Sequence, residues 1–187
     1  MKIILPVVMS LFVLACSNGQ GSKQYENQSE KITNVTSKDT LFKVYKDDSE
    51  SEEEFGYANQ KGEMVVPFGK FSYSFADTII HYGTVMEDFK MIAINSKGQQ
   101  LYEVYLFDNG PDYIEDGLFR IQENGKIGYA DGETGEVVIK PQFACALPFA
   151  NGQAQVANEC TLEGDGEHPD MKSDGWFFID KSGKKVK

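Results

Sequence analysis

The segment LFRIQENGKIGYADGETGEVVIKP, residues 118–141, carries the clearest structural pattern in the sequence. Its first residues favour a β-strand, and the Asn124-Gly125 pair that follows is a strong hairpin signal because both residues tolerate positive φ. A second β-favouring run leads into a turn at 131–135, and a third run ends at Pro141. The stretch therefore predicts three consecutive antiparallel strands, a β-meander.

The same pattern recurs along the chain. Residues 41–67 match residues 118–141 run for run, apart from a longer and acidic first turn, and weaker copies lie at 91–98 and 176–183. One turn glycine per copy aligns all four, at intervals of 36, 37 and 48 residues: Gly62, Gly98, Gly135 and Gly183. A period of roughly 20–50 residues is typical of repeat arrays. The sequence therefore predicts an all-β domain over 41–187, an array of about four antiparallel β-meander repeats. A solenoid-like array, a propeller-like array and one continuous twisted sheet remain open.

Alternation within the runs predicts how the sheets are buried. Phe119 and Ile121 alternate in the first run, and Ile127 and Tyr129 alternate in the second. Because successive side chains of a strand point to opposite faces, each sheet is expected to bury one face.

The most complete copy carries a wider pattern, from Ile127 to Val156. It reads apolar-Gly-Tyr-x-Asp, a turn, Val-Val-x-x-Pro, then Phe, and finally Phe-x-x-Gly-x-Ala-x-Val. This pattern resembles the WG repeat of bacterial proteins, over residues 41–187, although Gly56 and Gly128 follow Phe and Ile instead of Trp. The resemblance implies β-structure and a binding role rather than an enzyme. Glycines inside strands usually mark a bulge or a close backbone approach.

The N-terminus predicts export and a lipid anchor. Lys2 precedes an apolar segment that is too short to span a bilayer, so residues 1–15 are interpreted as a signal peptide. The segment ends Val-Leu-Ala-Cys, which resembles the lipobox of bacterial lipoproteins and implies acylation of Cys16. Residues 16–40 then form a lipidated, polar and flexible tether. By the same resemblance, the chain is expected in the cell envelope, in the outer membrane facing the periplasm.

Charge and cysteine content restrict the partners. The formal net charge is −11 with a single arginine, so nucleic acid is an unfavourable partner, and contact with the membrane is expected through the lipid alone. Cys145 and Cys160 form an even pair in an exported chain, which favours a disulfide worth about 3 kcal/mol in the loop-entropy model. Two separate thiols are the alternative. The sequence leaves the oligomeric state open.

The turn between the first and second strands varies most among the copies, over 46–54, 83–88, 122–126 and 157–175. Because insertions at one edge of an array often mark a binding face, we expect an acidic rim that meets a divalent cation or a basic partner. Solvated loops are the alternative. The rim would consist of Asp47, Asp48, Glu50, Glu52, Glu53, Glu54, Glu163, Asp165, Glu167 and Asp170. An EF-hand does not fit, because His168 stands where its loop needs glycine.

No catalytic constellation stands out. The chain has two histidines, no zinc-ligand spacing, no nucleophile elbow and no phosphate-binding loop, so no cofactor, no metal site and no enzymatic activity is expected. We expect a non-enzymatic envelope lipoprotein whose repeats form a protein-binding or scaffold module. The alternative is a lipoprotein that binds glycans or divalent cations through the acidic turns.

Overall fold

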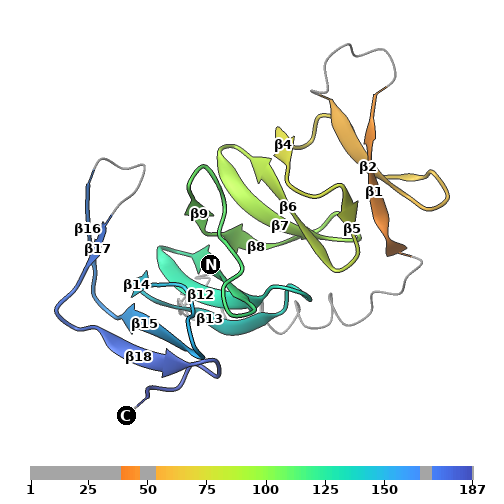
Figure 1. The fold of residues 1–187 in the computed structure, drawn as a ribbon. Coiled ribbons are helices and arrows are strands. Elements are labelled where there is room, and N and C mark those ends of the chain that lie inside the picture. The colour runs from red at the N-terminus through yellow and green to blue at the C-terminus, as the bar shows by residue number, and fades with distance from the viewer. Residues whose placement is uncertain (1–38, 47–53, 165–169, 187) are drawn as a thin grey trace, which may run out of the picture.

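The protein is an all-β array in the computed structural model, which describes residues 39–46, 54–164 and 170–186 (Figure 1). The strands are β1 (Leu41–Tyr45), β2 (Phe55–Asn59), β3 (Met64–Val66), β4 (Tyr73–Ser74), β5 (Thr78–Ile79), β6 (Tyr82–Glu87), β7 (Lys90–Asn95), β8 (Gln100–Val104), β9 (Leu106–Phe107), β10 (Gly110–Pro111), β11 (Leu118–Glu123), β12 (Lys126–Asp131), β13 (Val137–Phe143), β14 (Cys145–Ala146), β15 (Gln153–Ala157), β16 (Thr161–Glu163), β17 (Asp170–Lys172) and β18 (Phe177–Asp180). None of the described segments forms a helix with the length and apolar character needed to cross a bilayer.

Antiparallel pairing joins these strands into three larger sheets and two hairpins. The largest sheet has the order β13-β12-β11-β8-β7-β6-β4, and it follows a sheet of order β3-β2-β1-β5 and precedes one of order β14-β15-β18. The hairpins are β9–β10 and β16–β17, and Figure 1 shows β16–β17 standing away from the rest of the array. No described strand of the first sheet pairs with the last sheet, and Figure 1 shows these two sheets at opposite ends of the described array.

Four repeats share one pattern of strand pairing. Repeat one is β1–β3, repeat two is β6–β8, repeat three is β11–β13, and repeat four is β15 with β18, where a single bridge between Ile179 and Lys185 stands for the third strand. In every repeat the first strand starts opposite the last residue of the second strand: Leu41 opposite Asn59, Tyr82 opposite Asn95, Leu118 opposite Asp131, and Gln153 opposite Asp180. These pairs define equivalent positions in the four repeats.

The turn after the second strand is built alike in all four repeats. An Asn or Asp side-chain oxygen accepts backbone N–H groups of the turn, and the carbonyl of the same residue accepts the N–H of the turn glycine. The residue pairs are Asn59 with Gly62, Asn95 with Gly98, Asp131 with Gly135, and Asp180 with Gly183. All four glycines have φ between 68° and 79°, a region that other residues seldom adopt.

The interior repeats bury both faces of their sheets, so the expectation of one buried face per sheet was wrong for them. In the pairing of β11 with β12, Arg120 lies opposite Tyr129, and Ile121 lies opposite Gly128. Phe119 and Ile121 therefore share the opposite face from Ile127 and Tyr129. The alternation of side chains along a strand could not show that both faces are buried. It assigns each residue to one of two faces but does not tell what packs against either face.

Three core clusters lie between successive repeats. We call the face of a repeat that turns toward the next repeat its forward face, and the opposite one its backward face. Tyr57 of repeat one packs with Ile92 and Ile94 of repeat two, while Met91 and Ala93 on the other face of β7 pack toward repeat three. The third cluster joins the forward face of repeat three to repeat four. Stacking of faces, rather than one common core, thus holds the array together.

The strand glycines allow close backbone approach. A Cβ on Gly128 would contact the carbonyl oxygen of Ile139 and would lie 2.5 Å from the nitrogen of Pro141, and a Cβ on Gly56 would lie 2.6 Å from the carbonyl oxygen of Val66. In both repeats the third strand has an irregular register against the second strand here. Glycine is therefore required where the third strand crosses over the second.

The variable first turns do not share one edge in repeats two and three. The turn of repeat two is Asp88-Phe89 rather than 83–88, because 83–87 continue β6 as a regular strand paired with β7. Strands β8 and β11 are antiparallel, so the β6–β7 and β11–β12 turns leave their common sheet at opposite ends of its strands. Each of these repeats contributes three antiparallel strands to the sheet, so the first strand of repeat three runs opposite to the first strand of repeat two.

Candidate functional site

Two pairs of exposed aromatic rings form the most distinctive surface among the described residues. We call Tyr73, Phe75, Phe107 and Tyr113 the aromatic surface; their exposed fractions are 55%, 42%, 40% and 56%. Tyr73 and Phe75 meet edge to face with centroids 4.8 Å apart, and Phe107 and Tyr113 do so at 5.6 Å. A Cβ on Gly110, which pairs with Phe107, would lie 3.9 Å from the ring of Phe75, so the two pairs adjoin.

The surface is built by the segment that links repeat two to repeat three. Residues 105–117 leave β8, form the β9–β10 hairpin and return to β11. The hairpin turns at Asp108 and Asn109, which both have positive φ. Tyr73 and Phe75 come from β4 and its end, on the other side of repeat two in the chain. The surface thus collects rings from the segments that follow the third strands of repeats one and two.

A buried ion pair fixes this linking segment to repeat three. Arg120, the single arginine of the chain, is 4% exposed. Its Nε donates to Oδ2 of Asp112 at 2.9 Å and its Nη2 donates to Oδ1 at 2.5 Å, while the backbone N–H of Arg120 also donates to Oδ2 at 2.7 Å. Nη1 donates to the carbonyl of Ala146 at 3.2 Å. Such bidentate pairs have a defined geometry, so Asp112 is held in one place.

The same guanidinium supports aromatic rings. It lies 4.3 Å from the ring centroid of Tyr105 and 5.6 Å from that of Phe107. Tyr105 donates its N–H to the carbonyl of Arg120 and accepts the N–H of Asp112. Burial raises the pKa of Tyr105, with Arg120 acting in the opposite direction, so Tyr105 is neutral at physiological pH. The Arg120 contacts therefore hold the segment that carries Phe107 and Tyr113 in place.

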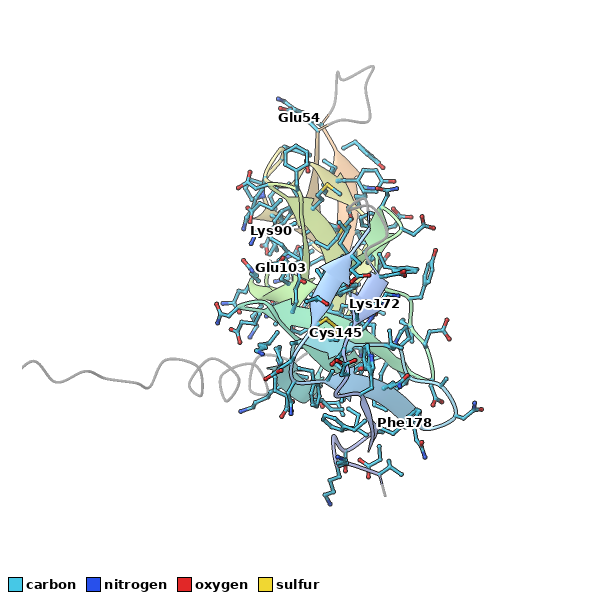
Figure 2. The ribbon with its side chains drawn as sticks, turned by 90° about the vertical axis from the view of Figure 1, so that its left-hand side faces the viewer. Glu54, Lys90, Glu103, Cys145, Lys172 and Phe178 are labelled. Carbon is cyan, nitrogen blue, oxygen red and sulfur yellow. A yellow bond between two sulfur atoms is a disulfide. The ribbon has the colours of Figure 1, made fainter. Side chains whose placement is uncertain are left out.

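The predicted acidic rim stays a prediction, because most of its members lie outside the described residues. Its members Asp47, Asp48, Glu50, Glu52, Glu53, Asp165 and Glu167 lie outside the described residues. Glu54 pairs with Lys46 at 2.5 Å beside repeat one, whereas Asp170 pairs with Lys172 at 3.3 Å and Glu163 is exposed on the β16–β17 hairpin. Figure 2 shows Glu54 and Lys172, which belongs to β17, at separate parts of the molecule.

The predicted cysteine pair lies at the base of that hairpin. Cys145 and Cys160 form a disulfide with Cα atoms 5.5 Å apart, which ties β14 to the segment before β16. An open hollow of about 740 Å³ adjoins it and is lined by Cys160, Glu163, Lys172 and Asp174, among others. The predicted lipidation site Cys16 lies outside the described residues. In the described ranges, no three His, Cys, Asp or Glu side chains come close enough to hold a metal ion.

Sequence reasoning missed the aromatic surface because no local pattern shows that residues 73–75 and 105–117 meet in space. The available signal was the insertion at 105–117, which places three aromatic residues in a segment without repeat character. The single arginine of an acidic chain was a second signal, since arginine is the residue best suited to a buried carboxylate pair.

Comparison with known proteins supports the repeat interpretation. The family model of the WG containing repeat matches residues 55–76 and 127–158, which fall in repeats one and three and in the segments that follow them. No curated protein and no solved structure matched the chain.

Proposed function

We propose that this WG-repeat-containing protein is a non-enzymatic cell-envelope lipoprotein whose β-repeat domain binds another protein. The observation that carries the proposal is the aromatic surface, part of which is held in place by the Arg120 contacts. Exposed aromatic rings clustered over a fixed backbone are typical of the central residues of protein interfaces. The lipid on Cys16 would anchor the chain in the outer membrane, facing the periplasm. The tether of residues 16–40 would hold the aromatic surface near that membrane.

The test is photo-crosslinking of the full chain in the producing cell. A photoreactive phenylalanine replaces Tyr113 on the aromatic surface or, as a matched control, Leu162, which is 62% exposed on the β16–β17 hairpin. We expect a discrete protein adduct from position 113 that is absent from position 162. The adduct should decrease at least tenfold when Phe107→Ser is combined with it, because one ring of the pair is removed. Equal adducts from the two positions would contradict the proposal.

A second candidate, glycan binding, is favoured by one specific observation. Exposed acidic residues are close to the outward rings in the sequence, with Asp108 directly after Phe107 and Glu115 two residues after Tyr113. Aromatic rings and carboxylates together suit sugar stacking and hydrogen bonds to hydroxyl groups. Titration of the purified chain with envelope glycan fragments distinguishes the candidates. Saturable binding that Tyr113→Ser abolishes would favour the glycan, and no binding would leave the protein partner.

A further inference from the structure

Two faces of the repeat array have no repeat covering them in the described structure. One is the backward face of repeat one, and the other is the forward face of repeat four. Each interior face of the array is buried against a neighbouring repeat. The two terminal faces are therefore the places where a further surface of this kind could stack.

The backward face of repeat one is apolar and protrudes. Phe42 occupies the position of Phe119 in repeat three, yet it is 41% exposed while Phe119 is 3% exposed. Met64 lies beside it at 44% exposure, and Ala58 is buried beneath these two side chains. Terminal repeats of soluble arrays usually carry a polar outer face, and this one does not.

The forward face of repeat four is hollow. Phe178 occupies the position of Tyr129, and it is 49% exposed where Tyr129 is 1% exposed (Figure 2). In the junction between repeats three and four, Tyr129 meets Phe149 edge to face at 4.7 Å, so an aromatic ring covers this position when it is buried. At Phe178 a hollow of about 460 Å³ is lined by Leu147, Pro148, Ala150, Asn151, Gln153, Gln155 and Phe178.

The protruding patch and the hollow are both free of charged side chains. Contact between the hollow and the protruding patch of Phe42, Ala58 and Met64 therefore buries no charged side chain. Within the chain, a forward face always receives the backward face of the next repeat. The contacts between successive repeats therefore provide an example of the contact that the two terminal faces could make.

We propose that a second molecule of this chain occupies each terminal face, with the backward face of repeat one in one molecule stacked on the forward face of repeat four in the next. The contact is head to tail, so each of the two molecules contributes a different surface. The pair keeps one free terminal face at each end, to which a third molecule can bind. The face of repeat one is three strands wide and five residues long, roughly 14 by 17 Å, and the face of repeat four has two strands and one bridge. Both faces are small for a permanent interface. The association is therefore reversible and dependent on concentration.

Sedimentation velocity on the purified full chain tests this. We expect the weight-average mass of the wild type to rise with concentration past that of a dimer. Phe42→Asp and Phe178→Asp should each lose this association, because each spoils one end. An equimolar mixture of the two variants should form a dimer and nothing larger, since each variant keeps the end that the other lacks. Dimers in the mixture also show that both variants are folded.

The matched control is Phe89→Asp, at a side chain that is 95% exposed in the β6–β7 turn and belongs to neither face; it should associate as the wild type does. A monomer at every concentration would overturn the proposal, and so would failure of the mixture to dimerise. Loss of association with Phe42→Asp but not with Phe178→Asp would also overturn it, because that result indicates back-to-back pairing.

Discussion

Repeats one and three have nearly the same sequence pattern but different environments. Lys43 and Arg120 occupy equivalent positions, yet Lys43 reaches an Asp77 side chain that is 91% exposed, at 3.6 Å, whereas Arg120 holds a buried Asp112. The same contrast separates Phe42 from Phe119. This contrast indicates that the pattern specifies the strands and turns, while the position in the array determines what each side chain contributes to stability.

The largest difference is expected at the two ion pairs. Asp112→Ala leaves the Arg120 charge buried without its partner, which should lower the free energy of unfolding by about 4 kcal/mol. Asp77→Ala removes an exposed partner and should cost less than about 0.5 kcal/mol. Urea unfolding measures both changes. As a control, Asp112→Ala combined with Arg120→Leu should recover part of the loss, and no recovery would argue against the unpaired charge as its cause.

A smaller difference is expected at the equivalent phenylalanines. Phe119→Ala opens a cavity between repeats two and three and should cost about 3 kcal/mol. Phe42→Ala removes a ring that is 41% exposed and should cost below about 1 kcal/mol at concentrations where the protein is monomeric. Equal losses in urea unfolding would mean that the backward face of repeat one is covered within the monomer.

Substitutions of the turn glycines in repeats one and three should differ less in their effect on stability. Gly62 has φ of 78° and open space around it, so Gly62→Ala costs only the backbone strain, about 1 kcal/mol. A Cβ on Gly135 would also lie 2.6 Å from the ring of Tyr82, which is held by a hydrogen bond to the carbonyl of Gly132 and by stacking on Phe119. Gly135→Ala should therefore cost about 2.5 kcal/mol. Thermal melts of the two variants give the comparison, and similar losses would contradict it.

Alkaline pH should reveal the smallest difference. Burial raises the pKa of Tyr129, opposed by Arg120, and burial raises the pKa of Tyr57 less, opposed by Ser74 and Lys43. Above the ordinary tyrosine pKa of about 10, the unfolded chain loses protons that the folded chain keeps. Stability is therefore complete below about pH 10 and falls as the pH rises further. Tyr129→Phe should flatten that fall more than Tyr57→Phe, as followed by urea unfolding between pH 8 and about 11; the reverse order would contradict the assignment.

The strands and turns could be predicted from sequence because their signals are local. Asn124-Gly125 and the four turn glycines act through the φ of single residues, which neighbours along the chain already specify. The stacking of the repeats could not be predicted in the same way. Tyr82 donates to the carbonyl of Gly132, fifty residues away, and no local pattern encodes such a contact.

The candidate site was even less predictable. Asp112 lies in a segment without repeat character, and its partner Arg120 lies in a strand where the repeats carry Lys43, Thr84 or Gln155 instead. The sequence suggests acidic turns as the binding region, because it shows charge density plainly. It does not show which connecting segments meet in space, and that meeting brings Phe75 next to the β9–β10 hairpin.

The pairing of strands with near neighbours along the chain has a consequence for how the protein is made. Among the pairs between named strands, Leu41 and Ile79 are the farthest apart in sequence, and they are separated by about one repeat length. Each named strand therefore pairs with a part of the chain that is near in sequence. Local pairing lowers contact order and favours fast folding. As the chain emerges during synthesis, repeat one can complete its sheet once β5 is available. Each later repeat then covers an apolar face that its predecessor left open, so the growing chain exposes about one such face at a time.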